Sequence, residues 1–363
     1  MCNTVTEMLA LFEKGEWQAS WVNNMRNNQQ LKTKEAESTY IYSVCTSIKP
    51  AREVPGIAED VRAGLFSLPR SLPPKYFYDE RGSQLFEQIC ATPEYYPTRT
   101  EEKLLTHYSE DIISQVRPTE IMELGSGNAQ KTRQLFDACE QTDHTCSYAP
   151  LDVCESMLES VSEQLQSDYD WLDVNPLLGD YHAGLKHLPE THGTRLYVFL
   201  GGTIGNFYPG QAKDFINEVK AIMRPGDYLL LGADRVKENH ILDAAYNDEQ
   251  GITAEFNLNV LNVLNREIGA DFNPANFEHK AEYNSEHNRI EMHVVSTCDQ
   301  IVYLQQLDKE INFQQGDSIL TEVSHKYTSD GLEELVEENG LNICNHYEPD
   351  NKYFSLVLAS CPE

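Results

Sequence analysis

The chain has few basic side chains and no long apolar run. Among its 363 residues, 28 Lys and Arg stand against 58 Asp and Glu, a formal net charge of −30 at pH 7. A surface this acidic repels phosphate backbones and anionic lipid headgroups, so we expect neither a nucleic acid nor a membrane partner. No apolar run approaches the roughly 18 residues that a membrane-spanning helix needs, and the first residues lack the layout of a signal peptide. We therefore expect a cytoplasmic protein.

The sequence also lacks paired metal-ligand motifs. Its nine cysteines are an odd number and form no C-x-x-C pair, which predicts buried free thiols in place of a disulfide framework or a zinc site. The 11 histidines are scattered, and His182 with His187 does not match H-E-x-x-H. We expect no bound metal.

What remains is the composition of a globular protein, with 40% hydrophobic and 24% charged residues and a length that suits about two domains. Residues 1–49 differ from the rest. Apolar residues recur at helical spacing from Val5 to Phe12, and beyond Trp21 the chain is rich in Asn and Gln. We predict an N-terminal extension over 1–49 that is partly helical or flexible.

From Glu120 onward, short apolar runs alternate with amphipathic helices, a rhythm that predicts a parallel sheet covered on both faces. Two strand-like runs close the chain, Leu341 to Tyr347 and Tyr353 to Ala359, and they predict an antiparallel hairpin. This combination is typical, at the level of fold analogy, of Rossmann-like methyltransferases. The parallel strands are expected at Ile121–Leu124, Tyr148–Leu151, Leu177–Leu178, Leu196–Leu200 and Tyr228–Leu231.

The rhythm breaks between Val236 and about Val323, which predicts a separate unit. Within it, Arg289 to Val295 alternates with a period of two and predicts a half-exposed strand. After it, Asp330 with Glu333 predicts a helix that starts with a capping-box-like pattern.

A glycine-rich loop, Glu123 to Gly127, leaves the first strand and enters a helix. Glycines there let the backbone approach a ligand, and the N–H groups at the helix start face it. The dinucleotide fingerprint needs a third glycine at position 130, where this chain has Gln130. This argues against a pyrophosphate on the helix end, and so against a nicotinamide-dependent dehydrogenase.

Two acidic residues at strand ends predict a nucleoside site. Asp152 closes the second strand, where a carboxylate can bind both ribose hydroxyls; its alternative role is a helix N-cap. Asp180 follows the third strand and is placed to accept from an adenine amino group, with Tyr181 able to stack. Together they describe a nucleoside without phosphates, and S-adenosylmethionine (SAM) fits that description.

The loop Gly201 to Phe207 follows the fourth strand, at the edge where open α/β sheets bind their substrates. Its amide side chain, Asn206, can donate to a carboxylate and accept from an amine, so it suits a zwitterion. Its alternative role is to stabilise the glycine-rich turn.

Five motifs in one order resemble the histidine-specific methyltransferase family of ergothioneine biosynthesis. Two are long: SLPPKYFYD, from Ser71 to Asp79, and PEYYPTRTE, from Pro93 to Glu101. Three are shorter: ELGSG at 123–127, GTIGN at 202–206 and LTEVS at 320–324. The resemblance runs from about Arg52 to Leu358.

The resemblance implies an enzyme that moves three methyl groups from SAM to the α-amine of L-histidine, giving the betaine hercynine. The cofactor contacts that it implies are Gly125, Lys131, Asp152 and Asp180, beside Tyr181. The substrate contacts are Tyr78, Phe86, Tyr95, Asn206, Tyr246, Glu322 and Ser324, with Met292 beside the ring.

The chemistry of these residues is consistent with such roles. Asn206 and the hydroxyls of Tyr95 and Tyr246 can hold the carboxylate, while Glu322 and Ser324, two apart on a strand-like run, can hold the two imidazole nitrogens. Orientation of the amine then supplies much of the rate. Tyr78 and Phe86 can present aromatic faces to the positive charge that grows on the amine. Tyr78 is also the candidate proton acceptor, and the alternative role of Phe86 is core packing.

The expected fold class is α/β: a Rossmann-like SAM-dependent methyltransferase sheet with a terminal antiparallel hairpin, plus a second α+β substrate-binding domain. We expect residues 50–99 and 237–326 in the substrate-binding domain, and 100–236 and 327–363 in the methyltransferase domain. The partner is the small molecule L-histidine, and we expect a monomer.

The chain departs from the family in two places. Residues 1–49 extend beyond the usual start, and Asn128 to Gln130 replace a segment that would be expected to begin with Thr-Ser. Two alternatives stay open. One is an amino-acid or indole N-methyltransferase of the same family, against which Glu322 argues. The other is an inactive nucleoside-binding regulator, which retention of every matched substrate position disfavours.

Overall fold

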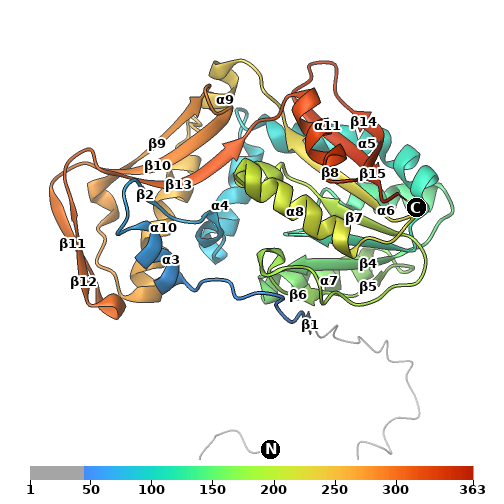
Figure 1. Ribbon diagram of the computed structural model, residues 1–363, viewed down its shortest axis with the longest axis horizontal. Helices are drawn as coiled ribbons and strands as arrows, with labels where there is room; N and C mark the ends of the chain where they lie inside the picture. Colours follow the sequence, from blue (N-terminus) through green and yellow to red (C-terminus); the bar gives the residue numbers. More distant parts are fainter. Residues whose placement is uncertain (1–44, 363) are drawn as a thin grey trace, which may run out of the picture. The chain divides into compact units, whose positions relative to one another are not determined.

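The computed structural model describes residues 45–362 (Figure 1). The helix predicted from Val5 to Phe12 and the polar stretch after Trp21 lie outside the described residues. Within residues 45–362, no helix combines the length and the apolar character needed to cross a bilayer. In the same residues, no three His, Cys, Asp or Glu side chains come together as metal ligands would.

A nine-stranded sheet forms the larger half of this unit, in the order β1-β6-β4-β3-β7-β8-β15-β14, with β5 beside β4. All its pairs are parallel except those of β15, which runs antiparallel to both β8 and β14. This confirms the predicted methyltransferase-like α/β sheet with its antiparallel end. Its strands are β1 Thr46–Ser47, β3 Glu120–Leu124, β4 Ser147–Asp152, β5 Asp173–Val174, β6 Leu177–Leu178, β7 Arg195–Phe199, β8 Tyr228–Asp234, β14 Asn342–Tyr347 and β15 Phe354–Ser360.

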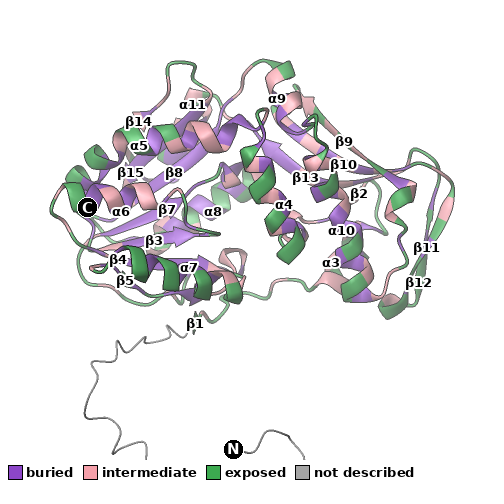
Figure 2. Cartoon of the chain, turned by 180° about the vertical axis from the view of Figure 1, so that it is seen from behind, coloured by how far each residue is buried: buried purple, intermediate pink, exposed green. Residues whose placement is uncertain are grey.

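Helices cover both faces of the large sheet, which is why its central strands are apolar along their whole length. All five residues of β7 are buried, and Figure 2 shows the central strands buried beneath helices with exposed outer faces. One apolar cluster joins the sheet to α5, α6 and α7, and a second joins it to α8 and α11. These helices are α5 Tyr96–Val116, α6 Arg133–Gln141, α7 Glu155–Asp168, α8 Pro209–Ile222 and α11 Ser329–Glu337.

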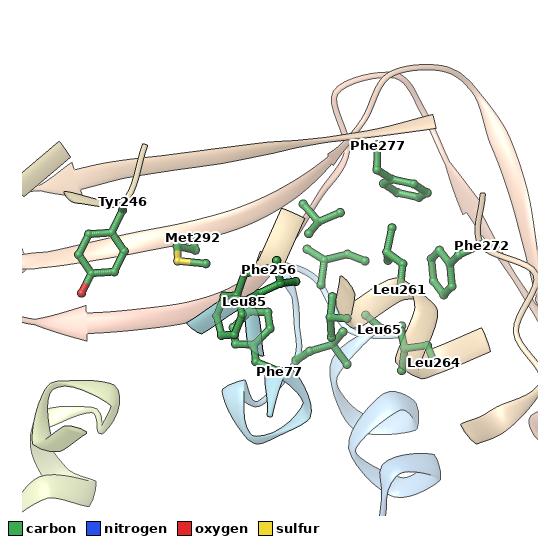
Figure 3. Close-up of a cluster of buried hydrophobic side chains, with 14 of the residues drawn as sticks. Leu65, Phe77, Leu85, Tyr246, Phe256, Leu261, Leu264, Phe272, Phe277 and Met292 are labelled. Carbon is green, nitrogen blue, oxygen red and sulfur yellow. The ribbon is translucent and has the colours of Figure 1, made fainter. Parts of the chain in front are cut away.

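A second sheet has the order β2-β13-β10-β9; β2 lies parallel to β13, and the other pairs are antiparallel. Burial alternates along β10, which confirms the predicted period of two. Its buried face, with Ile290 and Met292, packs on Phe256 and Leu261 of α10 (Figure 3). The elements here are α3 Ile57–Gly64, β2 Arg70–Ser71, α4 Glu80–Ala91, α9 Asn239–Ala245, α10 Ile252–Ile268, β9 Phe277–Asn284, β10 Arg289–Ser296, β11 Gln300–Leu304, β12 Lys309–Phe313 and β13 Ser318–His325.

Two local predictions were wrong. Helix α11 is capped by Thr328, whose hydroxyl accepts from the Gly331 N–H at 3.0 Å, so Asp330 lies in the first turn and is not the cap. The eight cysteines between residues 45 and 362 are free, as expected, but only Cys139 and Cys146 are buried. The spacing of the cysteines in the sequence indicates that they are free, whereas the burial of each one depends on how helices and strands pack.

The last residues of the predicted extension lie on the edge of the large sheet. Thr46 and Ser47 form β1, which pairs in parallel with β6, and Ile48 donates its N–H to the Leu178 carbonyl at 2.8 Å. Arg52 pairs with Glu218 on α8. Part of the range assigned to the extension therefore belongs to the large sheet, while the division into two domains remains a proposal.

This placement predicts two different outcomes for truncation. Removing residues 1–43 should leave the melting temperature within about 1 °C of the full chain, whereas removing residues 1–54 should lower it by at least about 2 °C, because β1 and the Ile48 contact are lost. Differential scanning calorimetry of the three proteins measures both effects. Equal stability of the longer truncation would show that β1 contributes nothing.

Candidate active site

The glycine-rich loop turns sharply at the carboxyl end of β3. Gly125 has a φ of +75° and donates its N–H to the Leu151 carbonyl at 2.8 Å. A Cβ at Gly125 would lie 3.3 Å from the Tyr181 ring, so a larger residue would press on that ring. Helix α6 begins only at Arg133, which leaves no helix end directly after Gly127 to carry a pyrophosphate.

Asp152 holds this loop from the end of β4. Its Oδ2 accepts from the Gly127 N–H at 2.9 Å and its Oδ1 accepts from the Cys154 N–H at 3.1 Å. Cys154, not Asp152, is the N-cap residue of α7, so the alternative role as a helix cap is excluded. Asp152 is half-exposed, and a carboxylate with about four lone-pair sites retains free sites for a diol.

Asp180 and Tyr181 lie after β6, near the Gly125 loop. Asp180 accepts from the backbone N–H of His182 at 2.7 Å and pairs with its Nδ1 at 2.8 Å. Burial alone would raise the pKa of Asp180, but the bonds from His182 lower it. The Tyr181 ring stacks on His182 at 4.4 Å between centroids. Asp180 also borders a cavity of about 510 Å³, which Ile48 and Arg52 help to line.

Lys131 is bound to a buried carboxylate that the residue-by-residue reasoning missed. Its Nζ lies 2.5 Å from Oε2 of Glu101, which is fully buried. Glu101 also accepts from the Gly201 N–H at 2.9 Å, and a Cβ on Gly232 would come within 2.1 Å of it. Glu101 closes the PEYYPTRTE motif, which is the signal that could have identified it. It ties α5 to the loops after β3 and β7.

Aromatic rings from four segments form a continuous chain. The Tyr78 ring meets Phe86 edge-on at 5.7 Å, Phe86 meets Tyr95 at 6.2 Å, and Tyr95 meets Tyr246 at 6.2 Å. Phe256 of α10, absent from the sequence prediction, lies 5.8 Å from Tyr78 and 6.1 Å from Phe86. Its helical spacing in an apolar stretch marks it only as a core residue.

Tyr78 is the most open of these rings, with 40% of its surface exposed. Its pKa is raised above the usual phenol value, because the surrounding protein removes part of the water from its hydroxyl and because the charge of the Glu322 carboxylate disfavours a phenolate. Burial likewise raises the pKa of Tyr95 and Tyr246, and Glu322 adds to the rise in both. All three phenols therefore remain protonated at neutral pH.

Met292, Glu322 and Ser324 share the inner face of the second sheet. Met292 pairs with Glu322 across β10 and β13, and Ser324 pairs with Ile290 one step further along. Burial raises the pKa of Glu322 to about 7, although the nearby Lys326 ammonium lowers it. Figure 3 shows Met292 and Tyr246 at the end of the cluster away from Phe272 and Phe277.

The turn that carries Asn206 packs against β13 because a glycine allows two segments to approach closely. Asn206 ends the 3₁₀ turn η3, Thr203–Asn206, after β7. A Cβ at Gly205 would lie 2.6 Å from the His325 carbonyl oxygen and 3.4 Å from Ser324 Oγ. Only glycine permits this approach, which brings the large sheet's loop against β13.

A buried cluster of charges lies behind Ser324, and nothing in the sequence pattern predicted it. Asp234, at the end of β8, lies 2.6 Å from Lys237 Nζ and 2.8 Å from Lys326 Nζ. The Tyr96 hydroxyl donates to the same carboxylate at 2.7 Å. Lys326 Nζ also lies 2.8 Å from Ser324 Oγ and 3.0 Å from the Tyr246 hydroxyl.

The family model for histidine-specific, SAM-dependent methyltransferases matches residues 57–361 of the chain. The chain belongs to this family. The resemblance that the five motifs suggested is therefore confirmed, and the match spans both sheets of the described unit.

Three curated relatives show how close and how wide the likeness is. The histidine N-alpha-methyltransferase of Mycolicibacterium smegmatis is 42% identical over 84% of this chain and 94% of its own length. That of Mycobacterium tuberculosis is 41% identical over the same shares. An L-tryptophan methyltransferase of Psilocybe serbica is 29% identical over 81% of this chain and 91% of its own length.

The structure of this family member brings the predicted site residues together in two groups. The first surrounds the carboxyl ends of β3, β4 and β6, and the second lies between the aromatic chain and β13. The loop after β7 lies against the second group, since a Cβ on Gly205 would come within 3.4 Å of Ser324 Oγ. Lys131 differs from the others because its ammonium is held by Glu101. The individual ligand contacts remain predictions.

The raised pKa of Glu322 predicts a pH-dependent stability of the ligand-free protein. Since the folded-state pKa is about 7 and the unfolded value is about 4.3, the folded state binds more protons between these values, and stability falls as pH rises through them. Glu322→Gln should therefore raise the melting temperature at pH 8 by several degrees and change it little at pH 4.

Glu278→Gln, at an exposed position on β9, is the matched control and should change neither value. Thermal unfolding at pH 4, 6 and 8 tests the expectation. A gain that was the same at all three pH values would show that Glu322 is not the titrating group.

Proposed function

We propose that this family member transfers three methyl groups from SAM to the α-amino group of L-histidine, giving hercynine, the first step of ergothioneine biosynthesis. The observation that carries the proposal is the placement of Glu322 and Ser324 on one face of β13, beside Met292. A carboxylate and a hydroxyl two residues apart suit a small ring with a polar nitrogen on each side. The identity with two histidine N-alpha-methyltransferases supports the same substrate.

The first group of residues has the chemistry that SAM needs. Asp152 offers free carboxylate sites for a ribose diol, Asp180 has an acceptor for an amino group, and Tyr181 has a ring to stack. The Gly125 turn leaves room beside that ring that a Cβ would fill. Lys131, the fifth implied contact, would approach from the Glu101 side. When bound, SAM supplies a methyl group on a positively charged sulfur.

The second group would hold the amino acid at its two ends. The Asn206 amide can donate to the carboxylate, as can the Tyr95 hydroxyl, while β13 holds the ring. Tyr78 and Phe86 would present aromatic faces to the amine. Such faces attract a cation by about 0.5 to 2 kcal/mol and keep doing so when the quaternary product can no longer donate hydrogen bonds.

Tyr78 is our candidate for the group that handles the amine proton. Its raised pKa means that the phenol is neutral, so its oxygen can take up the amine proton only as its own O–H proton leaves to a water molecule, and no phenolate is formed. Its hydroxyl can thereby aim the nitrogen lone pair. Much of the rate then comes from orientation, since both ends of the amino acid are fixed.

An indole amino acid is the second candidate, because the tryptophan methyltransferase of Psilocybe serbica is 29% identical to the chain. An indole has one N–H and a large apolar surface. Glu322 and Ser324 would leave one polar group unpaired against it, which costs binding free energy. We therefore place histidine first.

The remaining expectations concern the setting of the enzyme. We propose that it acts as a monomer in the cytoplasm and needs no metal. Free thiols over residues 45–362 support a reducing compartment. A reaction that needs only orientation and a methyl donor has no step that requires a metal.

The substrate proposal is tested by incubating the purified full chain with labelled SAM and each of the twenty amino acids. We expect histidine alone to give a product with three added methyl groups, identified by mass spectrometry. A tryptophan product in place of the histidine product would establish the second candidate.

Side-chain selectivity should depend on Glu322. A site built for a polar group rejects analogues that lack it, so Glu322→Ala should lower kcat/KM for histidine by at least about 100-fold, or about 2.7 kcal/mol. Larger apolar amino acids should lose less or gain. Steady-state kinetics with histidine, tryptophan and phenylalanine measure the effect; a uniform loss would assign Glu322 to the fold or the chemistry.

Cofactor affinity should depend on Asp152. Asp152→Ala removes the proposed ribose acceptors, each hydrogen bond to a charged group contributing about 1.5 to 3 kcal/mol, and should weaken S-adenosylhomocysteine binding by at least about 50-fold. Asp143→Asn, at an exposed position in the loop that precedes β4, is the control and should bind normally. Isothermal calorimetry measures both; unchanged affinity of Asp152→Ala would exclude the ribose role.

A further inference from the structure

Lys326 directs all its hydrogen bonds inward. Its side chain is only 1% exposed and lies 2.8 Å from Asp234 Oδ2. Its Nζ donates to Ser324 Oγ at 2.8 Å and to the Tyr246 hydroxyl at 3.0 Å. An ammonium has three protons and no lone pair, so these three partners use every donor. Lys326 has none left for a ligand and can act on one only through Ser324 and Tyr246.

The hydrogen bonds around Ser324 leave its proton free. Ser324 Oγ accepts from Lys326 and also from the Tyr246 hydroxyl, at 2.9 Å. A serine hydroxyl has two lone pairs and one proton. With both lone pairs used, Ser324 can only donate to a group in front of it. Ser324 therefore offers a ring a hydrogen-bond donor. The Glu322 carboxylate, on the same face, offers it an acceptor.

We propose that Lys326, anchored by Asp234, is a positioning residue that fixes the Ser324 hydroxyl as a donor to an unprotonated ring nitrogen. The site then reads the neutral imidazole, with one nitrogen accepting from Ser324 and the other N–H donating to Glu322. This inference rests on the proposed function. It also gives the Tyr246 hydroxyl a partner in Ser324, so that carboxylate binding falls to Asn206 and Tyr95.

Asp234 does not need Lys326 for neutralisation. Lys237 Nζ lies 2.6 Å from the same carboxylate, and the Tyr96 hydroxyl donates to it at 2.7 Å. Removal of either lysine leaves Asp234 paired with the other. Lys237 makes no bond to Ser324 or Tyr246 among the described residues, which makes Lys237→Met a matched control for Lys326→Met.

The test compares three ring types with the full-length enzyme: histidine, the two pyrrolylalanines, which keep an N–H but lack an acceptor nitrogen, and the two thiazolylalanines, which keep the acceptor but lack the N–H. For each ring type the better isomer is used. The variants are Lys326→Met, Ser324→Ala, their double mutant and Lys237→Met. The readouts are kcat and KM separately, with S-adenosylhomocysteine affinity and melting temperature as controls for folding.

We expect the wild-type enzyme to prefer histidine to pyrrolylalanine by at least about 100-fold in kcat/KM, because Ser324 would be unpaired against C–H. Lys326→Met should reduce this preference at least about tenfold, mainly through KM, because Ser324 can then turn its proton to the Tyr246 hydroxyl, 2.9 Å away, and no longer presents an unpaired donor to the C–H. The cost of Lys326→Met should nearly disappear in the Ser324→Ala background. Lys237→Met should leave the preference unchanged.

Three results would overturn the inference. One is an equal loss of kcat/KM for all ring types in Lys326→Met, or losses of the two single mutants that simply add in the double mutant. Either result would give Lys326 a structural role only. Another is a Ser324-dependent rejection of thiazolylalanine in place of pyrrolylalanine, which would make Ser324 an acceptor. The third is an unchanged preference in Lys326→Met.

If Lys326→Met does not fold, Tyr246→Phe frees the other lone pair of Ser324 while keeping the ring, and the same loss of preference is expected. No turnover of histidine by the wild-type enzyme would instead refute the proposed function. That outcome is distinct from normal histidine turnover with an unaltered ring preference in the variants, which would refute only the role of Lys326.

Discussion

The buried Asp234 carboxylate joins the two halves of this protein. It ends β8 of the large sheet, and it is bound by Lys326 from the end of β13 and by Tyr96 from the start of α5. A buried charge must be paired and hydrogen-bonded to be tolerated, so these elements are required to converge at one point. The loop after β7 and the face of β13 that carries Glu322 and Ser324 are brought together as a consequence.

The electrostatics of the site follow from that convergence. Burial raises the pKa of Tyr78, Tyr95 and Tyr246, so these rings are neutral donors and aromatic faces. The ammonium groups of Lys326 and Lys237 lie behind β13 and that of Lys131 is paired with Glu101, while Tyr78 presents a partly exposed aromatic ring. This arrangement suits a reaction whose product is a permanent cation, because cation–π attraction survives the loss of every N–H.

Much of the fold could be predicted because local patterns are sufficient for it. The short apolar runs of β3, β4, β7 and β8 marked a doubly covered parallel sheet, and the alternation along β10 marked a half-exposed strand. The helix cap at Thr328 was missed because two neighbouring polar residues offered similar patterns. The burial of each cysteine was missed because it depends on packing between elements.

The sequence by itself determined the family, the methyl donor's class and the residues that carry its motifs, since these are written in contiguous segments. Only the tertiary structure decided what Glu101, Phe256 and Lys326 do. Each gains its role from partners far away in the chain: Lys131 and Gly201 for Glu101, the aromatic chain for Phe256, and Asp234 for Lys326. The physical reason is that hydrogen bonds and ring contacts act over a few ångströms in space, whatever the separation along the sequence.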